Sequence, residues 1–247
     1  MTAPAPARVH AAHADAGEVE GRLREGAGGG VLEIRGARLM ASGLPERMWN
    51  GGDVTDPDPD LDAARAFFAE RGVDFGLRVP AGMPWRHGRR LLRLRIMAVE
   101  AAAFRPVNAA AVDVRAATPV DLDTVVAVDA AAFDSDPDSG RAWLAAHLGA
   151  EPVDTAIATL EGVPVATGYA IRTDGAGGPA LYVGGVGVVP AARRRGIGAA
   201  LSSWLVARGV ASGAEIAHLH ADTEDAARVY ARLAFADGEP LDVYVDL

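Results

Sequence analysis

Three consecutive strand-forming segments joined by tight turns constrain the fold of this chain more than any other feature. The segments VDTAIATL, VPVATGYAIRT and ALYVGGVGVV are separated only by the turns Glu161-Gly162 and DGAGG. Turns this short connect antiparallel neighbours, because a parallel connection needs a crossover of about a dozen residues or more. The sequence therefore predicts an antiparallel meander between residues 153 and 189.

Helices and further strands flank this meander in a definite order. Upstream, Val112–Arg115 is expected to be a strand, Thr118 and Pro119 suit the start of a helix, and GRAWLAAHLGA forms a second short helix. Downstream we expect a helix over roughly 195–212, then a strand in AEIAHLHAD, a helix in TEDAARVYARLAF and a strand in LDVYVDL. This order predicts an α+β fold, with a mixed, mostly antiparallel sheet flanked by helices.

The N-terminal part of the chain divides into two predicted regions. Residues 1–30 are rich in Ala, Gly and charge, and we interpret them as a flexible tail with some helix. Residues 31–108 contain the strand segments VLEIRG, ERMWN, VDFGLRV and LLRLRIMAV, with a helix in DPDPDLDAARAFFAERG. We therefore expect a smaller α/β unit over 31–108 and a larger unit over 112–247.

Composition and charge exclude several classes of function. The formal net charge is −9, whereas nucleic-acid binding needs a basic surface, so no nucleic-acid partner is expected. No uninterrupted apolar run reaches the roughly 18 residues of a membrane span, and the N-terminus has no apolar signal segment. We expect a cytoplasmic protein without a membrane partner. Cysteine is absent, which rules out disulfides, thiolate metal sites and a cysteinyl intermediate, and no metal is expected.

The segment VVPAARRRGIGAAL, residues 188–201, places three arginines at the start of a predicted helix. A helix N-terminus already carries partial positive charge, so this arrangement calls for an anionic partner. The two glycines, Gly196 and Gly198, allow a ligand to approach backbone N–H groups closely. A Walker A loop is excluded because the chain has no lysine, and a Rossmann turn would follow a parallel unit rather than a meander. A pyrophosphate cradle and an exposed basic loop both remain open on the turn alone.

The segment Arg193-Arg194-Arg195-Gly196-Ile197-Gly198 resembles the Arg/Gln-x-x-Gly-x-Gly/Ala motif of the GNAT superfamily of acyl-CoA N-acyltransferases. The preceding VGVVP and the order of elements resemble that family as well, over about 112–247. The resemblance implies acetyl-CoA as co-substrate. It further implies that its pantetheine arm pairs with the backbone of Val186, Gly187 and Val188. Its diphosphate would lie against the backbone of Arg193, Arg194, Arg195, Gly196, Ile197, Gly198 and Ala199.

TEDAARVYARLAF resembles a second motif of the family, Asn-x-x-Ala-x-x-x-Tyr-x-x-x-Gly-Phe, through Ala226, Tyr230 and Phe235. Thr223 stands where Asn is usual and keeps a hydroxyl for cofactor contact, while Ala234 replaces the glycine. The resemblance places Tyr230 beside the thioester sulfur as general acid, a role its phenolic O–H can fill. Packing of its ring against the sheet is the alternative.

The general base is less constrained. His218, His220 and Asp222 alternate, so all three are expected on one side of a strand. Some relatives carry a glutamate at the position of His218, and a histidine can accept a proton near neutral pH. We therefore take His218 as the candidate base, with a water chain as the alternative.

The acceptor side is predicted from loops. Asp134, Asp136 and Asp138 in FDSDPDSG follow the first helix of the larger unit and suit a cationic amine, although turn formation explains them equally well. The loops MPWRHG and MWNGG combine aromatic and polar residues, for which ordinary loop packing is the simpler reading. The unit over 31–108 is similar to the degenerate N-terminal half of some two-unit GNAT proteins, on arrangement alone, and would shape the acceptor site or extend the sheet rather than catalyse.

These observations lead to a predicted N-acetyltransferase that transfers acetyl from acetyl-CoA to a primary amine by direct attack in a ternary complex. A small molecule or a peptide could supply that amine, and a homodimer stays open. One rival is a non-catalytic acyl-CoA-binding or sensory protein, and another is an interaction module with a basic loop.

Overall fold

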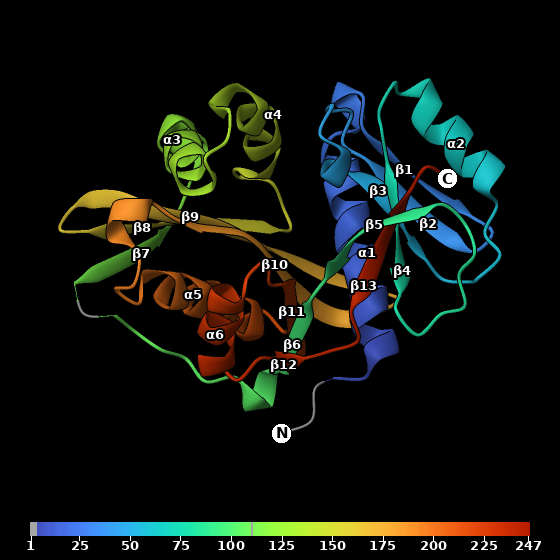
Figure 1. Ribbon diagram of the computed structural model, residues 1–247. Helices are drawn as coiled ribbons and strands as arrows, with labels where there is room; N and C mark the ends of the chain where they lie inside the picture. Colours follow the sequence, from blue (N-terminus) through green and yellow to red (C-terminus); the bar gives the residue numbers. More distant parts are fainter. Residues whose placement is uncertain (1–3, 110) are drawn as a thin grey trace.

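Two β-sheets stand side by side, and helix α1 (Pro6–Leu23) runs between them in a computed structural model of the protein (Figure 1). The structure describes residues 4–109 and 111–247. The other helices are η1 (Glu25–Ala27), η2 (Arg47–Trp49), α2 (Leu61–Glu70), η3 (Ala101–Ala103), η4 (Pro119–Asp121), α3 (Leu122–Phe133), α4 (Pro137–His147), η5 (Pro190–Ala192), α5 (Ile197–Ala211) and α6 (Glu224–Arg232). The strands are β1 (Gly30–Ile34), β2 (Ala37–Ala41), β3 (Asn50–Val54), β4 (Gly76–Pro80), β5 (Arg89–Leu94), β6 (Ile96–Glu100), β7 (Val112–Ala116), β8 (Val153–Leu160), β9 (Val163–Gly175), β10 (Gly178–Val188), β11 (Ile216–His220), β12 (Ala236–Asp237) and β13 (Leu241–Val245).

The strands form an N-terminal sheet in the order β1-β2-β3-β4-β13-β5 and a C-terminal sheet in the order β12-β6-β11-β10-β9-β8-β7. The predicted meander is β8, β9 and β10, which pair antiparallel. Parallel pairs occur between β3 and β4 and between β10 and β11. The predicted mixed, mostly antiparallel α+β fold flanked by helices is therefore confirmed.

The two predicted units exchange strands. β6 lies in the C-terminal sheet between β11 and β12, and β13 lies in the N-terminal sheet between β4 and β5. The segment LLRLRIMAV, predicted as one strand, is split at Arg95 into β5 and β6, which belong to different sheets. The sequence boundary near residue 110 is thus not a boundary between the sheets.

Helix α1 corrects the prediction of a flexible tail at the N-terminus. Val9, Ala12 and Ala16 are buried at helical spacing, and Pro6 occupies the first turn, where a proline needs no hydrogen bond. Val9 and Ala12 share a core with residues of β5, β6, β10, β11 and β13. A Cβ at Gly21 would lie 2.6 Å from Val31 Cγ1, so glycine allows the helix to sit tightly against the N-terminal sheet. Small residues that resemble a low-complexity tail therefore serve close packing.

The loop ERMWN departs from its predicted strand. Arg47–Trp49 form the short helix η2, and the strand begins at Asn50. The strand β2 was not predicted, although Arg35-Gly36 joins it to β1 as a two-residue turn.

Helices cover both faces of the C-terminal sheet. In Figure 1, α3 and α4 lie on one face and α5 and α6 on the other. Ile197, Leu201 and Leu205 of α5 are buried against the sheet at the four-residue spacing that the sequence predicts. Helix α2 packs Phe67 and Phe68 on the N-terminal sheet. The two sheets and the helices that cover them surround the candidate functional site.

Candidate active site

The turn between β10 and α5 leaves backbone N–H groups at the helix start without a side-chain cap. Arg194 and Gly196 have φ values of 64° and 80°, and Gly196 is the N-cap of α5 without any side-chain cap. The hydrogen bond from Ala200 N to Gly196 O, at 3.0 Å, opens the helix. The N–H groups of Ile197, Gly198 and Ala199 therefore precede the helical ladder and point out of the helix end. This is the arrangement that binds phosphate groups at helix N-termini.

Space remains next to these N–H groups. A Cβ built on Gly198 would meet only Val188 Cγ2, at 3.5 Å, which is ordinary contact. A Cβ on Gly196 would also find room, but its positive φ disfavours any side chain. Protein atoms therefore do not crowd the two glycines at the start of α5, and these residues fit the group that the sequence predicts.

The three arginines have different surroundings. Arg193 donates from Nε to Val188 O at 3.0 Å and from Nη2 to Ala132 O at 2.7 Å, so it ties the turn to β10 and to the end of α3. Arg194 and Arg195 are exposed, and no ion pair or side-chain hydrogen bond holds either of them within the described part of the chain. Arg193 positions the turn, whereas Arg194 and Arg195 are available to an anion.

The strands β10 and β11 separate next to this turn. Their parallel pairing is limited to Ala180–Tyr182 with Ile216–His218, although β10 continues to Val188. The edge of β10 that includes Val186, Gly187 and Val188 therefore lies beyond the paired region. An extended ligand chain could pair with that edge as an added strand.

A β-bulge interrupts β10 just before this edge. Tyr169 is paired with Gly184 and Thr167 with Gly187, so Gly185 and Val186 stand opposite the single residue Gly168. A bulge of this kind leaves a residue unpaired and redirects the strand. Gly185, with φ of 59°, makes the bend possible.

Tyr230 and Thr223 both lie on α6. The Tyr230 ring is buried in the core between α6, α5 and the C-terminal sheet, 5.9 Å from the ring of Phe235. Burial raises the pKa of Tyr230 to about 12, an effect that the Ser202 side chain partly offsets. Thr223 is the N-cap of α6, where its hydroxyl accepts a hydrogen bond from Ala226 N at 3.1 Å. The hydroxyl proton of Thr223 is still free to be donated.

The structure corrects the assignment of His218 as base. His218 and His220 share one face of β11, as predicted, but α1 covers that face instead of solvent. The His218 ring is fully buried, 5.5 Å from the ring of Tyr182 and 6.1 Å from that of His13, and neither ring nitrogen has a partner. Burial lowers its pKa to about 3. A neutral ring sealed in the core cannot exchange protons with a substrate.

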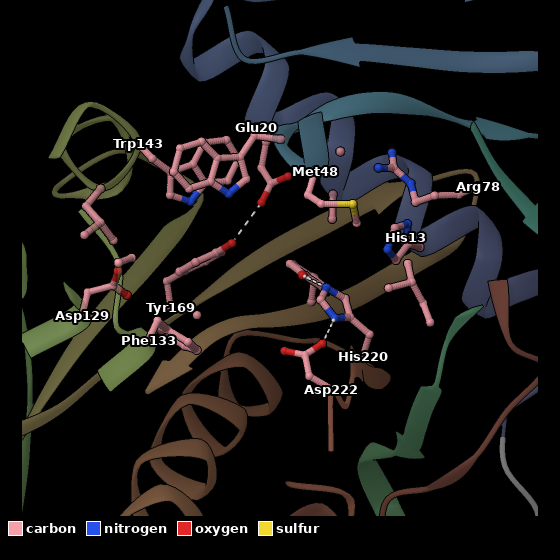
Figure 2. A pocket seen from close by; sticks show the side chains of 18 residues that line it. His13, Glu20, Met48, Arg78, Asp129, Phe133, Trp143, Tyr169, His220 and Asp222 are labelled. Atoms are coloured by element: carbon pink, nitrogen blue, oxygen red, sulfur yellow. Dashed lines mark hydrogen bonds and ion pairs between the residues drawn. The ribbon is translucent and has the colours of Figure 1, made fainter. Parts of the chain in front are cut away.

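A pocket of about 320 Å³ lies between the two sheets, below α1 and next to the bulge in β10 (Figure 2). Both halves of the chain supply its walls. The lining residues are His13, Ala16, Gly17 and Glu20 from α1, Met48, Trp49, Arg78 and Leu94 from the N-terminal half, and Asp129, Phe133, Ser135, Trp143, Leu144, Tyr169, Tyr182, Gly185, His220 and Asp222 from the C-terminal half.

Two polar groups of side chains border this pocket. On the C-terminal side, the Tyr182 hydroxyl is 3.0 Å from His220 Nε2, and His220 Nδ1 is 3.4 Å from Asp222 Oδ1, which lowers the pKa of Asp222. On the N-terminal side, Arg78 donates to both oxygens of Asp53, at 3.0 and 2.8 Å, and His13 Nδ1 lies 2.9 Å from the same carboxylate. The ion pair holds the pKa of Asp53 well below its usual range.

The predicted acceptor loops contribute unequally. From MWNGG, Met48 and Trp49 line the pocket, and Trp49 stacks on Trp143 with ring centroids 5.1 Å apart. From MPWRHG, Trp85 donates to His87 O and packs near Tyr244, away from the pocket. The carboxylates of FDSDPDSG do not line the pocket either: Asp134 is the C-cap of α3, and Asp136 accepts from Asp138 N.

Comparison with known proteins identifies the C-terminal half of the chain. Residues 124–235 match the Acetyltransferase (GNAT) family, a span that contains the α5 turn, the bulge in β10 and all of α6. The chain therefore carries a GNAT acetyltransferase domain over these residues. No curated protein matches the chain in a sequence search.

Solved structures show that the likeness extends over the whole chain. A GCN5-related N-acetyltransferase from Kribbella flavida is similar with a TM-score of 0.72 and 20% identity, covering 97% of this chain and 96% of that one. A GCN5-related N-acetyltransferase from Sphaerobacter thermophilus has a TM-score of 0.56 and 17% identity, covering 98% of this chain and 93% of that one. These likenesses show a shared fold that includes the N-terminal sheet.

The GNAT domain supports acyl transfer as the class of reaction, with an acyl-CoA as the co-substrate that this family generally uses. Among the described residues, no group of three or more His, Cys, Asp or Glu is placed to hold a metal ion. Within the same residues, no helix is both long and apolar enough to cross a membrane.

Proposed function

We propose that the protein is an N-acetyltransferase that moves the acetyl group of acetyl-CoA to a primary amine by direct attack in a ternary complex. The observation that carries this proposal is the uncapped start of α5, placed where β11 has separated from β10. An anion site and an open strand edge at the same place suit a ligand with a diphosphate and an extended amide-bearing arm. Acetyl-CoA has both parts.

Each part of the proposed site has one task. The N–H groups around Ile197–Ala199 hold the diphosphate, Arg194 and Arg195 add charge at its rim, and the edge Val186–Val188 aligns the pantetheine arm. The thioester then lies near the bulge in β10, which borders the pocket at Gly185. The amine enters from the pocket, so the two substrates meet from opposite sides of the splayed strands.

Tyr230 is the proposed general acid. Its raised pKa of about 12 keeps the phenol protonated at neutral pH, which a proton donor requires. When the amine nitrogen bonds to the carbonyl carbon and the carbon–sulfur bond breaks, the sulfur takes the Tyr230 proton. The phenolate recovers a proton from the new amide nitrogen. Without any cysteine in the chain, no thioester to the enzyme forms, so direct transfer is the simplest route.

Release of free CoA thiol in the presence of an amine panel tests this function. We expect acetyl-CoA-dependent thiol release that requires both substrates, with the amide product identified by mass spectrometry. Calorimetric titration gives the matching binding test. Gly198→Val should abolish acetyl-CoA binding in a folded protein, because the added side chain occupies the space next to the free N–H groups. Binding without thiol release would favour a sensory protein, and unchanged affinity in Gly198→Val would overturn the cradle.

A further inference from the structure

Glu20 is a carboxylate that the sequence gives no reason to single out. It lies in the C-terminal half of α1, within the region predicted as a tail, and its half-buried side chain faces the pocket. Its Oε1 accepts a hydrogen bond from the Tyr169 hydroxyl at 3.2 Å, which Figure 2 shows as a dashed line. The N-terminal helix therefore delivers an acidic group to a strand of the GNAT domain.

Tyr169 connects Glu20 to the bulge in β10. A Cβ built on Gly184 would lie 2.8 Å from the Tyr169 hydroxyl, and one on Gly185 would lie 2.8 Å from Tyr169 Cε1. The ring thus rests directly against the bulged backbone. A single tyrosine hydroxyl separates the Glu20 carboxylate from the place where the proposed function puts the thioester.

The charges around Glu20 come from several elements. Arg78 on β4 and Asp53 on β3 act on it from the N-terminal sheet, Tyr169 on β9 and Tyr182 on β10 face it from the C-terminal sheet, and His13 lies on its own helix. Arg78 already donates to both oxygens of Asp53, so its charge is largely committed. Among the described lining residues Arg78 is the one arginine, and Asp129 and Asp222 add further acidic groups. The pocket therefore attracts a cation.

We propose that Glu20 receives the ammonium group of a small primary amine and takes its proton, and that this amine has an apolar body and no carboxylate. This inference rests on the proposed acetyl transfer and names its base and its class of acceptor. The walls formed by Trp49, Phe133, Trp143 and Tyr169 hold the apolar body. An amino-acid substrate is disfavoured because the one arginine among the described lining residues is engaged by Asp53, while three of the lining residues are acidic.

The proton balance is simple. The ammonium nitrogen gives one proton to the Glu20 carboxylate and keeps its electron pair, which then forms the bond to the thioester carbon. The carboxyl returns its proton to water in the pocket before the next cycle. Burial raises the pKa of Glu20 to about 7, against the opposing effect of Arg78. The pKa of an alkylammonium is about 10, and that of an ordinary carboxyl is near 4. The raised pKa of Glu20 reduces this difference and so makes the proton transfer easier.

Glu20→Gln tests the assignment, because glutamine can still accept the Tyr169 hydrogen bond but cannot take a proton. With the best amine, we expect kcat/KM to fall by about 10²–10⁴-fold. In the native protein kcat/KM should rise with pH through an apparent pKa near 7. This rising limb of the pH profile should be absent in Glu20→Gln. Acetyl-CoA affinity and Tm should stay near those of the native protein. Glu18→Gln is the matched control, since Glu18 lies on the same helix but pairs with Arg38 outside the pocket.

Two further measurements separate the possible outcomes. The Asp129→Asn variant should keep the limb near pH 7, although burial raises the pKa of Asp129 to about 6. If that variant loses the limb while Glu20→Gln keeps it, Asp129 is the base and the proposal is wrong. Carbon-13 NMR of labelled glutamate, with Glu20→Gln for assignment, follows the Glu20 titration without turnover.

The amine panel for these measurements includes phenethylamine, butylamine, spermidine, glucosamine and phenylalanine. Phenethylamine or butylamine should lower the observed pKa of Glu20, whereas phenylalanine should not. If an amine shifts the Glu20 titration but is never acetylated, Glu20 keeps its role in amine binding and the proposed acetyl transfer is wrong. Full activity with an unchanged pH profile in Glu20→Gln, or preference for spermidine, glucosamine or phenylalanine, would overturn the inference and leave the transfer intact. If no amine binds and none is acetylated, both the inference and the proposed acetyl transfer are wrong.

Discussion

Burial sets the protonation state of two titratable side chains, one on each side of the C-terminal sheet. Tyr230, on the α5 and α6 side, keeps its proton because its pKa is raised to about 12. His218, on the α1 side, stays neutral because its pKa is lowered to about 3. Both shifts come mainly from desolvation, which penalises the charged form of either group. The same physical effect thus keeps a proton on Tyr230 for donation and prevents His218 from taking up a proton.

Tyr230→Phe isolates the phenolic proton. The ring keeps its packing against Phe235, so stability and CoA affinity should stay near those of the native protein. We expect kcat to fall by about 10²–10⁴-fold, the usual contribution of a general acid. Steady-state kinetics with a true amine substrate, together with calorimetric titration of CoA, measure the two quantities separately. Full kcat in this variant would remove Tyr230 from the mechanism.

His218→Phe tests the correction made by the structure. The folded pKa of about 3 lies below the unfolded value of about 6.5, so the unfolded chain binds the proton first. The contribution of His218 is therefore fully present above pH 6.5 and is lost as the pH falls toward 3. Relative to His218→Phe, the native protein should lose about 2–3 kcal/mol between pH 6.5 and 4.5.

Urea unfolding of both proteins at several pH values measures this difference. The variant should also keep the pH profile of turnover, because His218 does not border the pocket. A limb of the profile that disappears in His218→Phe would restore the histidine as base.

At the scale of elements, the turn into α5 combines groups with separate duties. The backbone N–H groups at the helix start are fixed by the turn, and Arg193 fixes the turn by holding Val188 O and Ala132 O. Arg194 and Arg195 project from it as exposed charges. Screening by salt should distinguish these roles, since it weakens the exposed charges of Arg194 and Arg195 far more than the short hydrogen bonds by which Arg193 holds the turn.

Alanine variants of the three arginines should respond differently to ionic strength. We expect Arg194→Ala and Arg195→Ala each to weaken acetyl-CoA binding by a few-fold at low salt, in line with about 0.2–1 kcal/mol for an exposed pair, and less at high salt. Arg193→Ala should weaken binding at both salt concentrations, because the turn loses its anchor. Calorimetry at low and high ionic strength measures this, with the exposed Arg86→Ala on the N-terminal half as control. Equal salt dependence for all three variants would contradict the assignment.

At the scale of the whole molecule, the strand exchange joins the two halves. β13, from the end of the chain, completes the N-terminal sheet, and β6 completes the C-terminal sheet between β11 and β12. Helix α1 contacts both sheets and buries Val9 and Ala12 in a core that both share. Neither half can unfold alone without opening the sheet of the other.

We therefore expect one cooperative unfolding transition. Differential scanning calorimetry should give a ratio of van't Hoff to calorimetric enthalpy near one, as for a single two-state unit. The fragment 112–247 should fail to fold by circular dichroism and NMR, because it lacks β6 and leaves β13 without its sheet. Two separate transitions, or a stably folded fragment, would show that the halves are independent.

Local patterns in the sequence were sufficient for much of the GNAT domain. The meander follows from short turns such as Glu161-Gly162, and the helix start at Thr118 is confirmed by its capping interaction with Asp121. The α5 turn was predicted because a glycine at positive φ and an uncapped helix start depend on neighbouring residues alone. Burial of Ile197, Leu201 and Leu205 follows from their spacing. These features are local, so the sequence determines them by itself.

Other features depend on contacts between distant parts of the chain, which only the tertiary structure decides. Helix α1 is rich in small residues, and its place between the sheets depends on close packing rather than on a strong apolar stripe. His218 and His220 have the same alternation in sequence, yet α1 seals one ring and the pocket receives the other. The raised pKa of Glu20 comes from burial, which outweighs the opposing effects of Arg78 and Tyr169, two residues that lie far along the chain. Desolvation is a property of the assembled surroundings, so no pattern within α1 could reveal it.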